Sequence, residues 1–202
     1  MRIKPLTSLI IEPTNTCNLR CTFCFVTEGM TRDEGFMDLK LFKKVIDDTP
    51  DLEHLCMHNW GEPLLHKQIF EMFDYAHQAG VKHIVMNTNG TLLTDKMINK
   101  IIESPLNIIR FSIDGSADTF KRIRGVELQK IKENILRLKK AKETKRPELS
   151  MGVVFTVEED TQEDVEEYIE HWETIVDHVR TQPKLIQSPR SEPCPEHDRQ
   201  SF

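Results

Sequence analysis

The chain of 202 residues is long enough for one sizeable hydrophobic core, and nothing before about residue 185 reads as a linker. Charged residues make up 30% of it and the net charge is −6, which argues against nucleic-acid binding and favours a small-molecule or peptide partner. The N-terminus has no signal-peptide core, and no apolar run approaches the ~18 residues of a membrane span. We therefore expect a cytoplasmic protein without membrane contact.

Short β-type segments alternate with longer helical patterns along the chain. The expected strands cover residues 8–12, 54–59, 83–88, 107–113, 150–157 and 178–182. The expected helices cover residues 39–47, 67–78, 94–102, 128–141 and 162–173. This alternation predicts an α/β fold with a parallel sheet and right-handed crossovers, as an open sheet or a barrel. From Pro183 onward proline and polar residues predict a loop or disorder.

Three of the five cysteines fall within eight residues, directly after the first expected strand. Cys17, Cys21 and Cys24 form a C-x3-C-x2-C pattern, and in a reducing compartment such clustered thiols suggest a metal site. Iron–sulfur cubes normally take four cysteines, so three local ones would leave one iron open for a ligand. A zinc site is the alternative, although zinc motifs usually add a second pair, which Cys56 and Cys194 do not supply.

This spacing, with aromatic Phe23 just before the third cysteine, resembles the radical S-adenosylmethionine (radical SAM) superfamily. The resemblance implies a partial (β/α)6 TIM-like barrel over residues 1–185. It also implies a [4Fe–4S] cluster on Cys17, Cys21 and Cys24, which serve as metal ligands and catalytic residues, with S-adenosylmethionine as the second cofactor and Phe23 close to it.

The segment from Asn59 to Pro63 is similar to the family's Gly-Gly-Glu-Pro segment. The resemblance implies that Gly61 and Glu62 help to hold the amino group of the methionine moiety, for which a carboxylate supplies a charge-assisted hydrogen bond. Trp60 replaces the first glycine and leaves the backbone contact at that position open. A common Gly-Glu-Pro turn is the alternative reading.

Further polar residues follow the third and fourth expected strands, at the end of the sheet that carries active sites in parallel barrels. By resemblance, Asn89, Ser112 and Asp114 approach the carboxylate and ribose of S-adenosylmethionine. The segment ending in Arg124 and Gly125 resembles the family branch with a SPASM extension, and Arg124 could clamp the cofactor carboxylate. Ordinary turns and a surface arginine near a helix end are the alternatives.

The resemblance implies reductive cleavage of S-adenosylmethionine to a 5′-deoxyadenosyl radical that abstracts hydrogen from a peptide or a sugar-like small molecule. Such an oxidoreductase or modifying enzyme would need an electron donor such as flavodoxin or ferredoxin. A cluster-binding scaffold without turnover and a zinc-binding structural domain remain as alternatives.

Other chemically suggestive residues are expected to be structural. Cys56 reads as a buried core thiol, and His58 and His66 as satisfied histidines. The basic stretch 139–146 reads as a solvated helix face. Cys194, in the irregular tail 186–202, resembles the first cysteine of a truncated SPASM-like extension and is expected to be unused.

Overall fold

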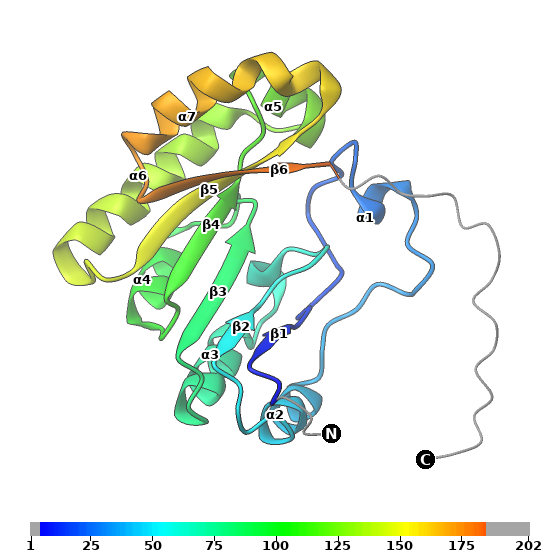
Figure 1. The fold of residues 1–202 in the computed structure, drawn as a ribbon, viewed down its shortest axis with the longest axis vertical. Coiled ribbons are helices and arrows are strands. Elements are labelled where there is room, and N and C mark those ends of the chain that lie inside the picture. The colour runs from blue at the N-terminus through cyan, green and yellow to red at the C-terminus, as the bar shows by residue number, and fades with distance from the viewer. Residues whose placement is uncertain (1–4, 185–202) are drawn as a thin grey trace.

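In the computed structural model, which describes residues 5–184, six strands form one parallel sheet. The strands are β1 (Ser8–Ile10), β2 (His54–Cys56), β3 (His83–Thr88), β4 (Ile108–Ser112), β5 (Ser150–Val157) and β6 (His178–Pro183). They pair in chain order, so β1 and β6 lie at the two edges. Figure 1 shows the sheet curled into an open half-barrel. The α/β class and the partial six-stranded barrel expected from the sequence are confirmed.

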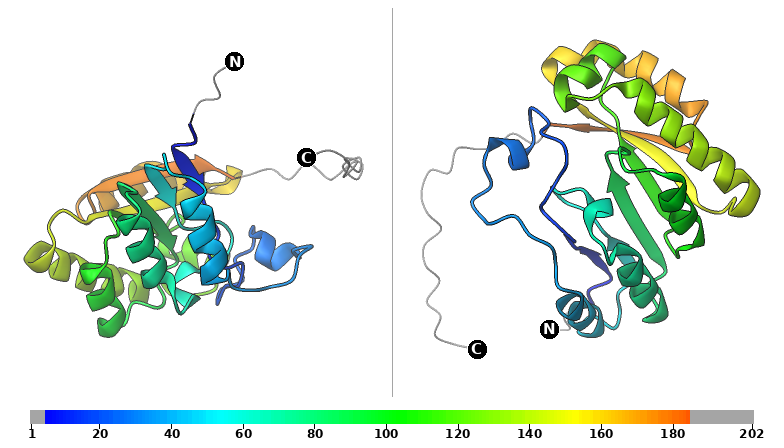
Figure 2. Two further views of the ribbon diagram at one scale, coloured as in Figure 1. Left: turned by 90° about the horizontal axis from the view of Figure 1, so that it is seen from below. Right: turned by 180° about the vertical axis from the view of Figure 1, so that it is seen from behind.

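Six helices of eight residues or more connect these strands within the described residues. They are α2 (Leu39–Asp47), α3 (Ile69–Gln78), α4 (Asp95–Glu103), α5 (Ala117–Arg124), α6 (Leu128–Lys145) and α7 (Val165–Glu173). Shorter elements are α1 (Phe25–Glu28), η1 (Pro63–Leu65) and η2 (Glu159–Asp164). The sequence pattern had not indicated α1 or η1, and η2 overlaps the start of the helix expected over 162–173. Figures 1 and 2 show the longer helices along the outside of the sheet, whereas the segment with α1 lies apart from them, beyond the strand ends.

The two faces of the sheet differ because successive strand residues point to opposite sides. On β3 and β4, Ile84, Met86, Ile109 and Phe111 are fully buried in the core beneath the helices. Their neighbours Val85, Asn87, Ile108, Arg110 and Ser112 are only partly buried and face the inside of the half-barrel. The inner face is therefore the polar and accessible one.

Local signals explain where several helices begin and end. The Thr94 hydroxyl accepts a hydrogen bond from the backbone N–H of Met97, as expected of a residue that caps a helix N-terminus. Gly125 ends α5 in the left-handed conformation with a φ of 72°, which glycine adopts at little cost.

The basic stretch 139–146 is not wholly a solvated face, and this prediction was wrong. Lys142 is buried and forms an ion pair with Asp177. The Arg146 guanidinium, 11% exposed, donates to the carbonyl oxygens of Ile101 (3.2 Å) and Leu106 (2.7 Å) at the end of α4. A cation at this position complements the negative end of the helix dipole.

Within residues 5–184, none of the helices is long and apolar enough to cross a bilayer. The predicted tail 186–202, with Cys194, lies outside the described residues.

Candidate active site

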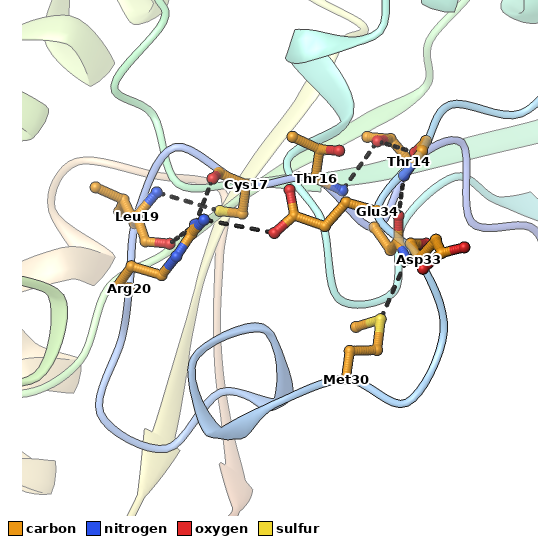
Figure 3. Close-up of polar contacts among 10 residues, drawn as sticks. Thr14, Thr16, Cys17, Leu19, Arg20, Met30, Asp33 and Glu34 are labelled. Carbon is orange, nitrogen blue, oxygen red and sulfur yellow. Dashed lines mark hydrogen bonds and ion pairs between the residues drawn. The ribbon is translucent and has the colours of Figure 1, made fainter.

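A closed loop, residues 14–36, carries the three clustered cysteines. Figure 3 shows the polar contacts around the first of them, Cys17. Its two ends meet in an antiparallel bridge between Thr14 and Phe36. The Thr14 hydroxyl donates to the Gly35 carbonyl (2.6 Å), and the Asn15 side chain bonds to the backbone of Asp33 and Gly35 (2.8 and 2.7 Å). These short contacts fix the neck of the loop, from which the cysteines project over the strand ends.

Within the loop, polar contacts shape the backbone around the cysteines. The Arg20 guanidinium donates to the carbonyl oxygens of Cys17 (2.7 Å) and Leu19 (3.0 Å), as Figure 3 shows. Cys24 occupies the N-cap position of α1. The Thr22 N–H donates to the Ile123 carbonyl (2.9 Å), which attaches the loop to α5.

The three thiols line one cavity together with residues from the strand ends. Cys21 is buried, and Cys17 and Cys24 are half-buried. Burial raises the pKa of Cys17, and it raises the pKa of Cys21 although Arg124 opposes this change. Among the described residues, no three His, Cys, Asp or Glu side chains converge on a point that could hold a single metal ion. The thiols share a cavity without sharing one coordination centre.

The loop after β2 packs closely against the base of the cysteine loop. A Cβ at Gly61 would lie 2.1 Å from the Thr14 carbonyl oxygen and 2.9 Å from that of Thr16, so this position accommodates only glycine. The next residue, Glu62, donates its backbone N–H to the Thr16 carbonyl (2.9 Å). Gly61 thus brings the Glu62 side chain next to the cysteines.

The Glu62 carboxylate is 1% exposed and lines the cavity. It accepts hydrogen bonds from the Thr88 hydroxyl (2.8 Å) and from the backbone N–H groups of Asn89 (2.7 Å) and Leu64 (3.1 Å). Burial raises the pKa of Glu62, and these hydrogen bonds oppose that change. The carboxylate is therefore fixed in place by three donors, none of which carries a formal charge.

Asn89 and Ser112, two residues selected from the sequence, also line the cavity. The Asn89 amide donates to Asn18 (2.9 Å) and lies 3.9 Å from the Cys17 sulfur, so it ties β3 to the cysteine loop. Asn87, which sequence reasoning had not selected, lines the same cavity, and its buried Oδ1 has no hydrogen-bond partner within the described part of the chain. An unsatisfied buried acceptor suggests a missing donor at this point.

Arg124 and Asp114 form a buried ion pair behind the cysteines. The Arg124 side chain is 10% exposed, donates its Nε–H to Asp114 (2.5 Å) and lies 3.7 Å from the Cys21 sulfur. Burial is the largest influence on Arg124 and by itself would lower its pKa, but Asp114 together with Cys21 and Cys24 outweighs burial and holds the pKa above its usual value. Asp114 is fully buried, also accepts from the Thr156 N–H (2.9 Å), and does not line the cavity. The two oxygens of Asp114 are thus taken by Arg124 and the Thr156 N–H, and the cofactor contact expected of Asp114 stays a prediction.

Two aromatic residues form walls of the cavity. Phe23 lies beneath the Arg124 guanidinium at 6.0 Å. Trp60 packs edge-on against Phe25 with ring centroids 4.2 Å apart, and its backbone N–H donates to Glu12 (3.0 Å). Tryptophan therefore fits where the family pattern has glycine, and its backbone N–H is already used by Glu12.

The histidines and Cys56 differ in part from what was expected. His66 is buried and satisfied by the backbone of Met37 and Gln68. His58, in contrast, lines the cavity, and burial, aided by Arg110, lowers its pKa to about 4. Cys56 is half-buried on the inner face, 3.1 Å from the His58 ring, rather than in the core. Its place on a strand of apolar neighbours gave no signal of this.

A model of the radical SAM superfamily matches residues 11–171, which include the cysteine loop and every strand from β2 to β5. The chain belongs to the radical SAM superfamily. Members of this superfamily use a [4Fe–4S] cluster and S-adenosylmethionine, the two cofactors expected from the sequence.

Curated radical SAM relatives are longer than this chain. A tungsten-containing aldehyde ferredoxin oxidoreductase cofactor-modifying protein of Pyrococcus furiosus is 33% identical over 159 residues, which are 74% of this chain and 44% of the relative. A GTP 3′,8-cyclase of Desulforamulus reducens is 32% identical over 120 residues, 57% of this chain and 37% of the relative. The chain spans less than half the length of these relatives.

Solved radical SAM structures share the fold at low identity. SuiB of Streptococcus suis bound to S-adenosylmethionine superposes with a TM-score of 0.72 at 16% identity, covering 91% of this chain and 42% of that one. The structure of anSMEcpe with bound AdoMet gives 0.72 at 20% identity, covering 90% and 52%. At these identities the likeness establishes the half-barrel fold.

Proposed function

We propose that this radical SAM protein binds a [4Fe–4S] cluster through Cys17, Cys21 and Cys24 and cleaves S-adenosylmethionine reductively. The observation that carries the proposal is one cavity in which three thiols face a buried carboxylate and lie beside a buried guanidinium. Three thiolates on separate irons would leave a fourth iron open for a ligand. The chemistry supplied by the bound cluster is one-electron reduction of the sulfonium, which yields methionine and a 5′-deoxyadenosyl radical.

The number of thiols supports a cluster over zinc. A structural zinc ion usually takes four ligands, whereas a cube held by three thiolates leaves its fourth iron open. Among the described residues, no group of three or more His, Cys, Asp or Glu side chains is placed to hold one metal ion. The zinc-domain alternative is separated by the iron and sulfide analysis given below.

The chain's own side chains would orient S-adenosylmethionine. Glu62 offers a negative charge to the cofactor's ammonium group, with its carboxylate already fixed by Thr88, Asn89 and Leu64. The unpartnered Oδ1 of Asn87 offers a further acceptor in the same cavity. Such preset acceptors need little reorganisation when a cation binds.

Arg124 would provide the opposite charge. Its Nε is held by Asp114, and one terminal nitrogen already reaches toward Cys21, so the guanidinium can attract a thiolate or the cofactor carboxylate. Phe23 and Trp60 cover the sides of the cavity and help to exclude water. Ser112 and Asn89 complete the polar lining.

The radical would abstract hydrogen from a peptide or a small molecule. Both substrate classes occur among similar proteins: SuiB has been solved with its precursor peptide SuiA, and the GTP 3′,8-cyclases are named for a nucleotide. An electron donor such as flavodoxin or ferredoxin would supply the reducing electron.

The test is to replace Cys17, Cys21 and Cys24 together by alanine in protein prepared without oxygen. We expect loss of bound iron and sulfide and of the brown chromophore, and loss of 5′-deoxyadenosine formation after dithionite reduction. Wild-type protein that binds iron and sulfide but forms no 5′-deoxyadenosine would indicate a scaffold, and bound zinc without sulfide would indicate a structural zinc domain. Retention of the cluster in the triple variant would contradict the ligand assignment.

A further inference from the structure

Arg110 is a cation on the inner face of the half-barrel for which the described protein provides no counter-charge. It lies at the middle of β4 and is partly buried. Its Nε–H donates to the His178 ring nitrogen Nε2 (3.1 Å). Within residues 5–184 no carboxylate lies within ion-pair distance (4.0 Å) of Arg110, and the hydrogen bonds of this part of the chain leave its two terminal nitrogens unused.

The surroundings of Arg110 hold its guanidinium in one orientation. The His178 ring lies flat over Gly152, where a Cβ would meet its Nε2 at 2.1 Å, so only glycine leaves room for it. Its other nitrogen, Nδ1, lies 3.2 Å from the Ser150 hydroxyl. Burial, Arg110 and Arg180 lower the pKa of His178, which keeps the ring neutral and able to accept from Arg110. The Nε edge of Arg110 is therefore held in place by His178, which in turn packs on Gly152 and contacts Ser150.

The local charge on this face is positive. Arg180 on β6 is close enough to lower the pKa of Arg110, after the larger effect of burial. Carboxylates at the strand ends have other partners: Glu12 pairs with Arg32, Asp114 with Arg124, and Glu62 is held by three neutral donors. Neighbouring like charges raise the free energy of the empty site and favour the binding of an anion beside them.

The position of Arg110 connects it with the proposed active site. Its Cα pairs with that of Asn87 across β3 and β4, and Ser112 lies two residues further along β4; both line the cavity. Arg110 also influences His58, another lining residue. We propose that Arg110, supported by His178 and joined by Arg180, binds an oxyanion of the substrate, a carboxylate or phosphate group, deeper in the half-barrel than the cysteines. This inference rests on the proposed function for its assignment to the substrate.

Guanidinium geometry supports this assignment. The two free terminal nitrogens present parallel N–H donors that match the two oxygens of a carboxylate or phosphate. Arg124, on α5, lies beside the cysteine loop, 3.7 Å from Cys21, whereas Arg110 lies within β4, two residues before its end. The two arginines therefore serve separate anions, one near the sulfurs and one on the substrate.

The first test measures anion binding by the full chain through its thermal unfolding. Sodium phosphate and, separately, sodium acetate are titrated at constant ionic strength with chloride. Ligands that bind only the folded state raise the unfolding temperature. We expect a rise with at least one of the two anions, and the more effective one identifies the group as phosphate or carboxylate. Absence of a rise with both anions would overturn the inference.

Variants assign the effect to Arg110. Arg110→Gln should lower the affinity for the anion about 10-fold or more, because it removes charge-assisted hydrogen bonds. Arg110→Lys, which keeps the charge but lacks the planar fork, should give an intermediate loss. Lys130→Gln removes one positive charge from the exposed surface of α6 and should leave the affinity unchanged. Equal anion affinity in Arg110→Gln and Lys130→Gln would overturn the inference, even if Arg110→Lys folds poorly.

A second experiment tests whether Arg110 binds the substrate or the cofactor. Cluster-loaded wild-type protein is titrated with the same anion in the presence of saturating S-adenosylmethionine. We expect the anion to raise the unfolding temperature by as much as it does without S-adenosylmethionine. Loss of that stabilisation would assign Arg110 to the cofactor carboxylate and overturn the proposal. If the protein does not bind S-adenosylmethionine, the proposed function fails, while the anion titration still decides whether Arg110 forms a site.

Discussion

The cysteine loop and the ends of the strands face each other across one cavity but are built in opposite ways. In the loop, α1 has no buried residue, and Arg20, which shapes the backbone around Cys17, has a side chain that is 54% exposed. At the strand ends, Glu62 is 1% exposed and Asp114 is fully buried. The outer part of the loop rests on exposed polar contacts, whereas the neck of the loop and the strand ends rest on buried polar groups.

This difference separates two tasks of a cofactor site. Segments with few buried contacts open locally at low cost, so the loop can admit and enclose a cluster. Ligand binding then adds the stability that the loop lacks, since metal affinity is coupled to the ordering of the ligands. The strand ends need no such help, because Glu62, Asn89 and Arg124 are already fixed. Variants on the two sides should therefore differ most in what they do to the folded chain.

The largest effect is expected at the buried ion pair. Asp114→Asn leaves the Arg124 guanidinium without its counter-charge, and breaking a buried pair typically costs about 3 kcal/mol or more. Urea unfolding should show this loss. The matched control is Asp48→Asn, which breaks the exposed pair of Lys44 and Asp48 on α2 and should leave the unfolding midpoint unchanged. Equal effects of the two substitutions would show that the buried pair of Asp114 and Arg124 does not stabilise the strand ends.

The contact between the two sides depends on a glycine. Gly61→Ala places a Cβ 2.1 Å from the Thr14 carbonyl oxygen, and relief of this overlap must separate the Glu62 segment from the neck of the loop. We expect a loss of about 1–3 kcal/mol in the free energy of unfolding, the usual cost of overpacking.

Gly35→Ala is the control for Gly61→Ala in the same neck. A Cβ at Gly35 meets nothing within 4 Å, so this variant should unfold like the wild type. If the two alanine variants are equally stable, the close approach of the Gly61 backbone to Thr14 is not a determinant of stability.

The next effect is a pH dependence from His58. Burial and Arg110 lower its pKa from 6.5 to about 4, so the folded state binds a proton less readily than the unfolded state. The stability that neutral His58 contributes is present above pH 6.5 and is lost as the pH falls toward 4, by about 2 kcal/mol between pH 8 and pH 5. His58→Gln should make urea unfolding less sensitive to pH in this window. An unchanged pH slope would contradict the burial of a neutral ring.

Much of the fold followed from sequence because local and global signals agree. The strands at 83–88 and 150–157 and the helix at 39–47 have the bounds that their patterns predicted. Strand β2 ends at Cys56 rather than Asn59, because its last residues turn into the loop that brings Glu62 to the cysteines. The α/β alternation could not choose between an open sheet and a barrel, since curvature arises from packing over the whole sheet.

The sequence selected residues that the fold brings to one cavity, among them the three cysteines and Glu62, but it could not show which partners each side chain has. For Asp114, only the fold shows that Arg124 and the Thr156 N–H bond to its carboxylate. Lys142 and Arg146 were assigned to a solvated face, because their partners lie 35 to 45 residues away in sequence. Ionic partners far along the chain leave no periodic signal.

The smallest effect is expected in the loop itself. Arg20→Gln removes hydrogen bonds to the carbonyl oxygens of Cys17 and Leu19 and the exposed ion pair with Glu34, and it should leave global unfolding unchanged, because the loop opens separately from the core. Local opening should become easier by about 1 kcal/mol, roughly a 5-fold change in population. Chymotrypsin cleavage after Phe23 or Phe25 should accelerate by this factor in cluster-free protein, with Lys40→Gln on α2 as an unaffected control.

The same cleavage assay on cluster-loaded protein sharpens the comparison between the two sides. Metal–thiolate bonds to Cys17, Cys21 and Cys24 would hold the loop far more strongly than the Arg20 contacts do, so the wild type and Arg20→Gln should then be cleaved equally slowly. A difference of 5-fold in both states would mean that Arg20, and not the ligand, orders the loop. The division of the cavity into a ligand-dependent side and a preset side would then no longer hold.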